Sequence, residues 1–248
     1  MIYIRGDTHG ELSCFTDERM PGQSAWGAGD KLIITGDFGF VFYGGEGSPA
    51  EKSNLDVLAK KPYEILFVDG NHENFDILET YPEEMRYGAP VRWIRPNIFW
   101  LQRGYVYTIE NKTFFVMGGG YSLDKARRLE YQRICGQKVW FGQEMPSPAE
   151  YHRAAESLRQ QNMTVDYILT HTAPRLIIPQ VIGRAPDPHE AELNGFLDWV
   201  YYEVTFKKWF FGHLHEDADL YNLMIACHEK VHRLEECNPK AKPGAQCH

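Results

Sequence analysis

Short apolar runs recur along this chain, and five of them end directly in a small polar cluster. The runs are rich in Ile, Leu, Val, Phe and Tyr and are bounded by Gly and Asp, a pattern that predicts buried β-strands. They cover residues 1–4, 32–35, 65–68, 167–169 and 209–211. Because the carboxyl ends of parallel strands form the ligand-binding edge of an α/β sheet, we expect the polar clusters to meet at that edge.

Helical patterns alternate with these strands. Apolar residues at helical spacing and helix-start signals predict helices over residues 11–20, 48–61, 74–81, 147–161 and 189–204. Ser147 and Glu150 have the spacing of a capping box, in which each side chain bonds the backbone of the other residue at the start of a helix. Strand–helix–strand connections of this length imply right-handed parallel crossovers.

The middle of the chain has a different pattern. Residues 97–101, 105–110 and 112–117 read as short strands, with Glu110-Asn111-Lys112 as a hairpin turn, and residues 219–234 predict a closing hairpin. These segments indicate an antiparallel portion and a second sheet packed on the first. Residues 118–148 have three consecutive glycines, many charges and little periodicity, which predicts a long excursion over the surface.

Composition and charge narrow the class of protein. The chain has 248 residues, 43% of them hydrophobic and 24% charged, which fits one ordinary globular domain; we place it at residues 1–234, with a flexible tail at 235–248. The formal net charge of −8 argues against binding to duplex nucleic acid but not against a small phosphorylated substrate. No apolar run is long enough to span a bilayer, so we expect a cytoplasmic protein with no membrane partner. The oligomeric state is left open.

The five cysteines are scattered, which favours reduced thiols over a disulfide framework. Three of them lie near the end of the chain among histidines. Two interpretations are open for this end of the chain: a structural zinc site, or a tail that binds no metal. The candidate zinc ligands are Cys227, Cys237, Cys247, His228, His232 and His248. They include no CxxC pair, so the tail that binds no metal is the preferred interpretation.

The polar clusters at the strand ends carry the chemistry. They supply Asp7 and His9, Asp37, Asn71 and His72, His171, and the pair His213 and His215. Any one of them has an ordinary explanation as a turn residue or a surface histidine. Five clusters that all follow apolar runs indicate instead a metal site, and oxygen and nitrogen donors without thiolates favour manganese, iron, zinc or a similar ion.

The ordered motifs Asp-x-His, Gly-Asp, Gly-Asn-His-Glu, His and Gly-His-x-His resemble those of the calcineurin-like metallophosphoesterase superfamily. The likeness extends from Ile4 to His215. It implies a mixed α/β (α+β) fold, a two-sheet β sandwich flanked by helices, that carries two divalent metal ions at the carboxyl ends of its strands.

The resemblance also implies a role for each motif residue. One metal ion would be held by Asp7, His9 and His215, the other by Asn71, His171 and His213, and Asp37 would bridge the two. His72 would be the catalytic histidine, stabilising charge or protonating the leaving group beside Asp37. The implied enzyme is a dimetal hydrolase in which a metal-bridged hydroxide attacks a phosphate ester.

The sequence departs from the family pattern at Phe40, where many relatives have an Asp that orients the catalytic histidine. Glu73 or Asp69 could take over that task, or His72 could work without a carboxylate partner. The arginines of serine/threonine phosphatases and of diadenosine tetraphosphate hydrolases are also missing. A phosphodiester or small nucleotide is therefore the preferred substrate, with a phosphomonoester, including a phosphoprotein, as the alternative; a non-catalytic metal-binding scaffold is the rival from another class.

Four residues are candidates for substrate contact. Arg127 and Arg128 could bind phosphate through their planar guanidinium groups, and Arg175 is the basic residue nearest in sequence to His171. Phe40 follows the bridging Asp37 closely enough to line a pocket wall. Their ordinary alternatives are a solvated loop for the arginines and a buried core position for the phenylalanine.

Overall fold

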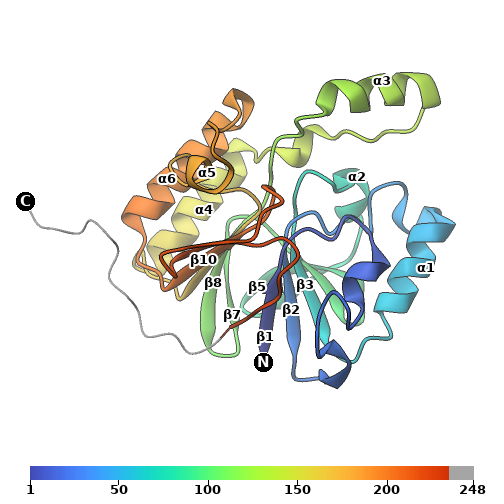
Figure 1. Cartoon of the computed structure of the whole chain (residues 1–248), viewed down its shortest axis with the longest axis horizontal. Helices are drawn as coiled ribbons and strands as arrows, with labels where there is room; N and C mark the ends of the chain where they lie inside the picture. The colour runs from blue at the N-terminus through green and yellow to red at the C-terminus, as the bar shows by residue number, and fades with distance from the viewer. Residues whose placement is uncertain (235–248) are drawn as a thin grey trace, which may run out of the picture.

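Two mixed β-sheets pack face to face, with helices on their outer surfaces (Figure 1). This computed structural model describes residues 1–234, so the predicted flexible tail and the cysteines and histidine beyond residue 234 lie outside the described part of the chain. The two-sheet sandwich confirms the fold expected from the sequence. Within residues 1–234, no helix is long and apolar enough to cross a membrane.

The first sheet has seven strands in the order β13-β1-β2-β3-β6-β5-β4. Strands β1, β2, β3 and β6 run parallel, and the remaining strands pair antiparallel. The bounds are β1 Ile2–Arg5, β2 Lys31–Thr35, β3 Glu64–Val68, β4 Glu83–Arg86, β5 Ala89–Arg95, β6 Ile98–Leu101 and β13 His232–Arg233.

The second sheet has six strands in the order β11-β12-β10-β9-β8-β7, with parallel pairing from β12 to β8 and an antiparallel strand at each edge. The bounds are β7 Tyr105–Ile109, β8 Lys112–Met117, β9 Tyr167–Thr170, β10 Lys208–Phe211, β11 Ala218–Leu220 and β12 Met224–Ala226. Glu110 and Asn111 have φ values of 50° and 58°, as a two-residue hairpin turn requires, so the predicted hairpin is confirmed. The predicted closing hairpin is β11 and β12, after which β13 returns to the first sheet.

Six α-helices complete the described chain. They are α1 Pro49–Leu58, α2 Phe75–Leu78, α3 Lys125–Cys135, α4 Pro148–Gln160, α5 Ile178–Ile182 and α6 Ala191–Glu203. In Figure 1, α1 and α2 lie on the side of the first sheet and α4, α5 and α6 on the side of the second, while α3 projects from the edge of the molecule. The capping box of Ser147 and Glu150 is present at the start of α4.

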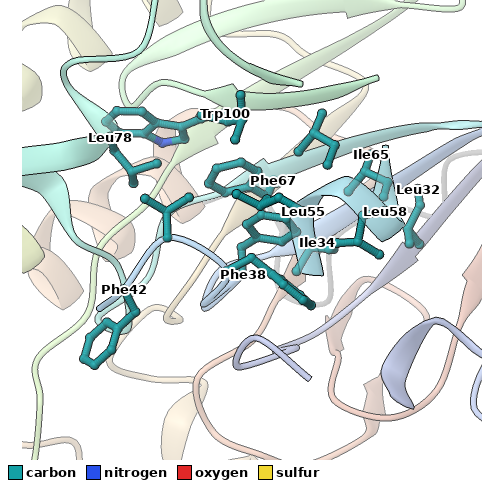
Figure 2. Close-up of a cluster of buried hydrophobic side chains, with 14 of the residues drawn as sticks. Leu32, Ile34, Phe38, Phe42, Leu55, Leu58, Ile65, Phe67, Leu78 and Trp100 are labelled. Carbon is teal, nitrogen blue, oxygen red and sulfur yellow. The ribbon is translucent and has the colours of Figure 1, made fainter. Parts of the chain in front are cut away.

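The alternation of side chains along the strands divides the core into layers. Ile33 and Leu66 face the second sheet, whereas their neighbours Ile34 and Phe67 face outward toward α1. Figure 2 shows this outer cluster, in which Phe38 stacks on Phe67 with ring centroids 4.4 Å apart. A matching apolar layer joins the far side of the second sheet to α4 and α6. Because both sheets are buried on both faces, their strand ends are held in fixed relative positions.

Two predicted segments differ in the structure. Residues 11–20 form one 3-10 turn, Leu12–Phe15, rather than a helix, because side chains such as Thr16 and Asp17 bond nearby backbone groups and compete with helical hydrogen bonds. Conversely, the excursion at residues 118–148 contains the eleven-residue helix α3. Its apolar periodicity is weak because, of its residues, only Arg128 is buried.

Candidate metal centre

The carboxyl ends of five parallel strands bring the predicted ligands together. Strands β1, β2 and β3 of the first sheet deliver Asp7 with His9, Asp37, and Asn71 with His72. Strands β9 and β10 of the second sheet deliver His171 and the pair His213 and His215. All seven predicted metal ligands therefore lie at one edge of the sandwich.

Four of these residues have a backbone conformation that is uncommon outside glycine. The φ values of His9, Asp37, His213 and His215 are 46°, 48°, 66° and 54°. A left-handed conformation at a non-glycine residue costs on the order of 1–3 kcal/mol and persists where the surrounding structure enforces it, as at functional sites. The described chain has seven other non-glycine residues with positive φ, so the strain agrees with the sequence motifs at these four positions but is not confined to them.

Glycines permit the close approach of the ligand side chains. A Cβ atom at Gly70 would lie 2.1 Å from Asp37 Oδ1, and one at Gly36 would lie 1.9 Å from His171 Nδ1. Both positions are incompatible with any side chain while the ligands stay in place. The glycines of the Gly-Asp and Gly-Asn-His-Glu motifs thus have a packing role in the site.

The donor atoms form two groups that meet at Asp37. In the first, ligand atoms of Asp7, His9, Asp37 and His215 all lie within 4.8 Å of one another. In the second, His171 Nε2 lies 3.1 Å from Asn71 Oδ1 and 3.3 Å from Asp37 Oδ1. Asp37 faces His9 with its other oxygen, Oδ2, at 3.7 Å. Its carboxylate thus presents one oxygen to each group, as a bridging ligand would.

His213 belongs to the second group through its ring, whose centroid lies 4.8 Å from that of His171. The other side of this ring is held by Glu190, whose Oε1 atom is 3.3 Å from His213 Nε2. Glu190 is buried and also accepts hydrogen bonds from Thr172, Asn194 and the amide of Tyr121. Burial raises the pKa of Glu190, but His213 and the hydrogen bonds outweigh burial and lower this pKa to about 2.

The electrostatics of the centre favour a cation. Burial lowers the pKa of His171, but the carboxylates of Asp37 and Asp7 outweigh burial and raise this pKa to about 10. Likewise, His9 Nε2 and His215 Nε2 face each other at 3.1 Å beside the buried carboxylate of Asp7. Clustered carboxylates and imidazoles with no thiolate fit divalent ions of intermediate hardness.

Residues 2–217 match the profile of the Calcineurin-like phosphoesterase family. The chain belongs to this family. It is also 25% identical over 209 residues to the lariat debranching enzyme of Schizosaccharomyces pombe, an alignment that covers 75% of this chain and 42% of that enzyme. The chain thus spans less than half the length of this relative.

Calcineurin-like phosphoesterases use two divalent metal ions, and the two donor groups of this chain fit such a pair. Asp7, His9, Asp37 and His215 would hold one ion, and Asp37, Asn71, His171 and His213 the other. The structure leaves the identity of the metals open.

The predicted catalytic histidine of this phosphoesterase has an unexpected partner. Arg128 Nη2 donates a hydrogen bond to His72 Nε2 over 2.5 Å, while Asp124 accepts from Arg128 Nε at 2.7 Å. Arg128 Nη1 also donates to the carbonyl oxygen of Asn71 at 3.0 Å. Burial and the positive charge of Arg128 lower the pKa of His72 to about 4, although Asp37 acts in the opposite direction.

The carboxylates suggested as partners of His72 have other roles. Glu73 accepts from the amides of Phe38 and Gly39 and so supports the Asp37 loop. Asp69 is buried against Arg103 and the indole of Trp100. The position of the expected carboxylate, Phe40, is 1% exposed and packs on Phe15 and Phe38. Phe40 is therefore a core residue, and its predicted contact with substrate is corrected.

Three clefts are lined by predicted metal ligands, and the two larger ones border His72. The α3 cleft has a volume of about 390 Å³, and its lining includes His9, His72, Phe42, Tyr43, Arg127, Arg128 and Tyr131. The Arg184 cleft has a volume of about 300 Å³, and its lining includes Asp37, Asn71, His72, Arg184, His213 and His215. These two clefts share His72, Asp124 and Arg127, and a smaller third cleft of about 190 Å³ shares Arg184 and His213 with the Arg184 cleft.

These clefts test the predicted arginines. Arg127 and Arg128 line the α3 cleft, and their contact with phosphate stays a prediction, whereas Arg175 pairs with Asp198 of α6. Sequence reasoning missed Arg184 and Glu190. Arg184 follows a glycine in a proline-rich loop and carried no local signal, and Glu190 lies 23 residues before the histidine that it contacts.

Proposed function

We propose that this protein is a metal-dependent phosphodiesterase that acts on a small or nucleotide substrate. The observation that carries this proposal is that the two larger clefts beside the predicted metal ligands share only His72, Asp124 and Arg127. A phosphodiester has two alcohol groups and a monoester has one, so two clefts match the shape of a diester. The partial likeness to a lariat debranching enzyme adds weak support.

Two divalent ions bound at this centre would neutralise phosphate oxygens and lower the pKa of a water molecule. The chain supplies the remaining functions. Asp37 holds the two donor groups together, and its Oδ1 atom also accepts from the amide of His72 at 2.7 Å, which fixes this histidine next to the centre. Arg128 adds a buried positive charge beside His72, where negative charge develops as an ester bond breaks.

In this arrangement His72 Nε2 accepts a hydrogen bond, since a guanidinium only donates. The ring is therefore neutral, with its proton on Nδ1. Of the two roles predicted for His72, stabilisation of charge together with Arg128 fits this geometry better than donation of a proton from Nε2.

Rates on two chromogenic substrates separate the possible functions. With Mn²⁺ added, we expect kcat/KM for bis-p-nitrophenyl phosphate to exceed that for p-nitrophenyl phosphate by about tenfold or more. Preference for the monoester would favour a phosphomonoesterase, including a protein phosphatase. If metal binds but neither ester is cleaved, the chain is a non-catalytic scaffold.

The Asp37→Ala variant tests the mechanism directly. It removes the carboxylate that faces both donor groups, so both hydrolysis and tight metal binding should be lost. Asp56→Ala, at an exposed position of α1, is the matched control. An Asp37→Ala protein that still turns over substrate would refute the proposed mechanism.

A further inference from the structure

Aromatic side chains from two separate segments line the α3 cleft. Phe42 and Tyr43 come from the loop after Asp37, and Tyr131 comes from α3, with Arg127 and Arg128 along the same helix. Tyr43 and Tyr131 are 57% and 45% exposed, although each borders a cleft next to the metal centre. Figure 2 shows Phe42 at the margin of the buried cluster, apart from Phe38 and Phe67.

The loop that carries Tyr43 is rigid. Four consecutive backbone amides, at residues 42–45, donate to the carboxylate of Glu51 over 2.6–2.8 Å. The ring of Tyr43 also packs edge-on against Phe42, with centroids 5.0 Å apart. An exposed ring on a fixed backbone is a preorganised contact surface, which reduces the entropy lost when a ligand binds.

The α3 part of the lining is fixed by polar contacts. Arg128 ties α3 to the Asn71 loop, and Lys138 pairs with Asp76 of α2 at 2.5 Å. Gln137 Nε2 reaches the carbonyl oxygen of Tyr43 at 3.5 Å, so the segment after α3 contacts the loop that carries Tyr43. Both segments that supply the aromatic lining are therefore anchored.

The charges of the cleft suit a phosphorylated ligand. Arg128 is buried beside His72, and Arg127 is largely exposed and pairs with Asp124. A ring system that is planar, apolar on its faces and attached to a phosphate would contact the tyrosines and the arginines at the same time. Nucleobases stack on aromatic side chains in this way.

We infer that the α3 cleft binds the nucleobase of one of the two alcohol groups of the substrate, with the base between Tyr43 and Tyr131. This inference rests on the proposed phosphodiesterase function and specifies its substrate class as a nucleotide diester. The base is recognised by stacking, so the cleft accepts more than one base.

Binding of adenosine tests this site without catalysis. Equilibrium dialysis with metal-free protein should show saturable binding to the unaltered chain and about tenfold weaker binding to Tyr43→Ala and Tyr131→Ala. Tyr131→Phe keeps the ring and should retain binding. Tyr202→Ala, at a tyrosine of α6 that is 69% exposed, is the matched control and should bind normally. Ribose alone should not bind.

Kinetics connect this site with the reaction. The same two alanine variants should lose about tenfold in kcat/KM on a dinucleoside monophosphate. Failure of adenosine to bind, or equal binding by the alanine variants, would overturn the nucleobase site even if diesters are cleaved. Tyrosine-dependent adenosine binding by a protein that cleaves only monoesters would instead refute the diesterase proposal and leave the site standing.

Discussion

Arg128 donates a hydrogen bond to His72 over 2.5 Å, from a helix that belongs to a different part of the chain. Where we expected a carboxylate near the predicted catalytic histidine, this chain has a guanidinium that is itself held by Asp124 at 2.7 Å. The positive charge of Arg128 therefore lies beside the predicted metal ligands, and the carboxylate of Asp124 orients its guanidinium group.

Replacement of Arg128 tests the importance of this contact. Arg128→Ala removes a cation next to the reacting phosphate, and we expect kcat/KM to fall by about 10²–10³. Metal binding should persist, because the seven predicted ligands remain. Steady-state kinetics and isothermal titration with Mn²⁺ measure the two effects.

The matched control is Arg133→Ala, which removes an exposed arginine of α3 that pairs only locally with Glu130. It should leave both measurements unchanged. If Arg128→Ala and Arg133→Ala have the same kinetics, Arg128 has no part in the reaction.

Glu190 holds the ring of His213, and we expect its loss to weaken metal binding. Removal of a carboxylate that orients a metal-binding histidine typically costs about 10- to 100-fold in affinity. Glu190→Gln should lose less than Glu190→Ala, since an amide oxygen can still accept from Nε2. Titration calorimetry with Mn²⁺ or Zn²⁺ compares them with Glu192→Ala, an exposed neighbour in α6; equal affinities in all three variants would contradict this role.

Gly70→Ala probes the packing of the centre. Its Cβ atom would lie 2.1 Å from Asp37 Oδ1 and 2.7 Å from His171 Nε2, so ligands of both groups must move. We expect loss of most activity and of tight metal binding. Gly27→Ala is the control, since its Cβ atom would have open space; a fully active Gly70→Ala protein would show that the ligand loops can rearrange.

Glu64 makes the stability of the fold depend on pH. Burial raises its pKa, but a hydrogen bond from Tyr87 and the charges of Lys31 and Arg86 outweigh burial, so its pKa lies below the ordinary value of 4.5. A lowered pKa contributes stability that is fully present above pH 4.5 and is lost as the pH falls through the folded pKa.

Urea unfolding of the original chain and of Glu64→Gln measures this contribution. The difference in unfolding free energy should be of the order of 1 kcal/mol or less at neutral pH, because solvent screens the interactions of the half-buried Glu64 with Lys31 and Arg86. This difference between the two proteins should become smaller as the pH falls below 4.5. A difference that grows as the pH falls would contradict the assignment.

Sequence patterns correctly predicted those parts of the fold that depend on residues close together in the chain. The buried strands and the polar residues after them are adjacent in sequence, so the pattern placed Asp7, Asp37 and His171 at strand ends, and the family resemblance gave their predicted roles as ligands. The capping box at Ser147 and the hairpin at Glu110 are equally local.

The partners of the ligands depend on contacts between distant segments. Arg128 lies 56 residues from His72, and its role follows from the position of α3, whose weak apolar periodicity concealed the helix. Phe40 and Arg175 were misleading for the same reason: closeness in sequence to a ligand does not decide whether a side chain faces the core, the flank or the cleft.

Helix α3 is attached to the rest of the chain by charged contacts rather than by an apolar face, so this segment can change separately from the strands that carry the predicted ligands. No residue of α3 belongs to the apolar clusters of the core, and Arg128 is the only buried residue of this helix. Residues such as Tyr131 can therefore change with little cost to stability, while the ligands on the strand ends stay the same. Substrate preference and hydrolytic chemistry can then evolve on separate segments of one chain.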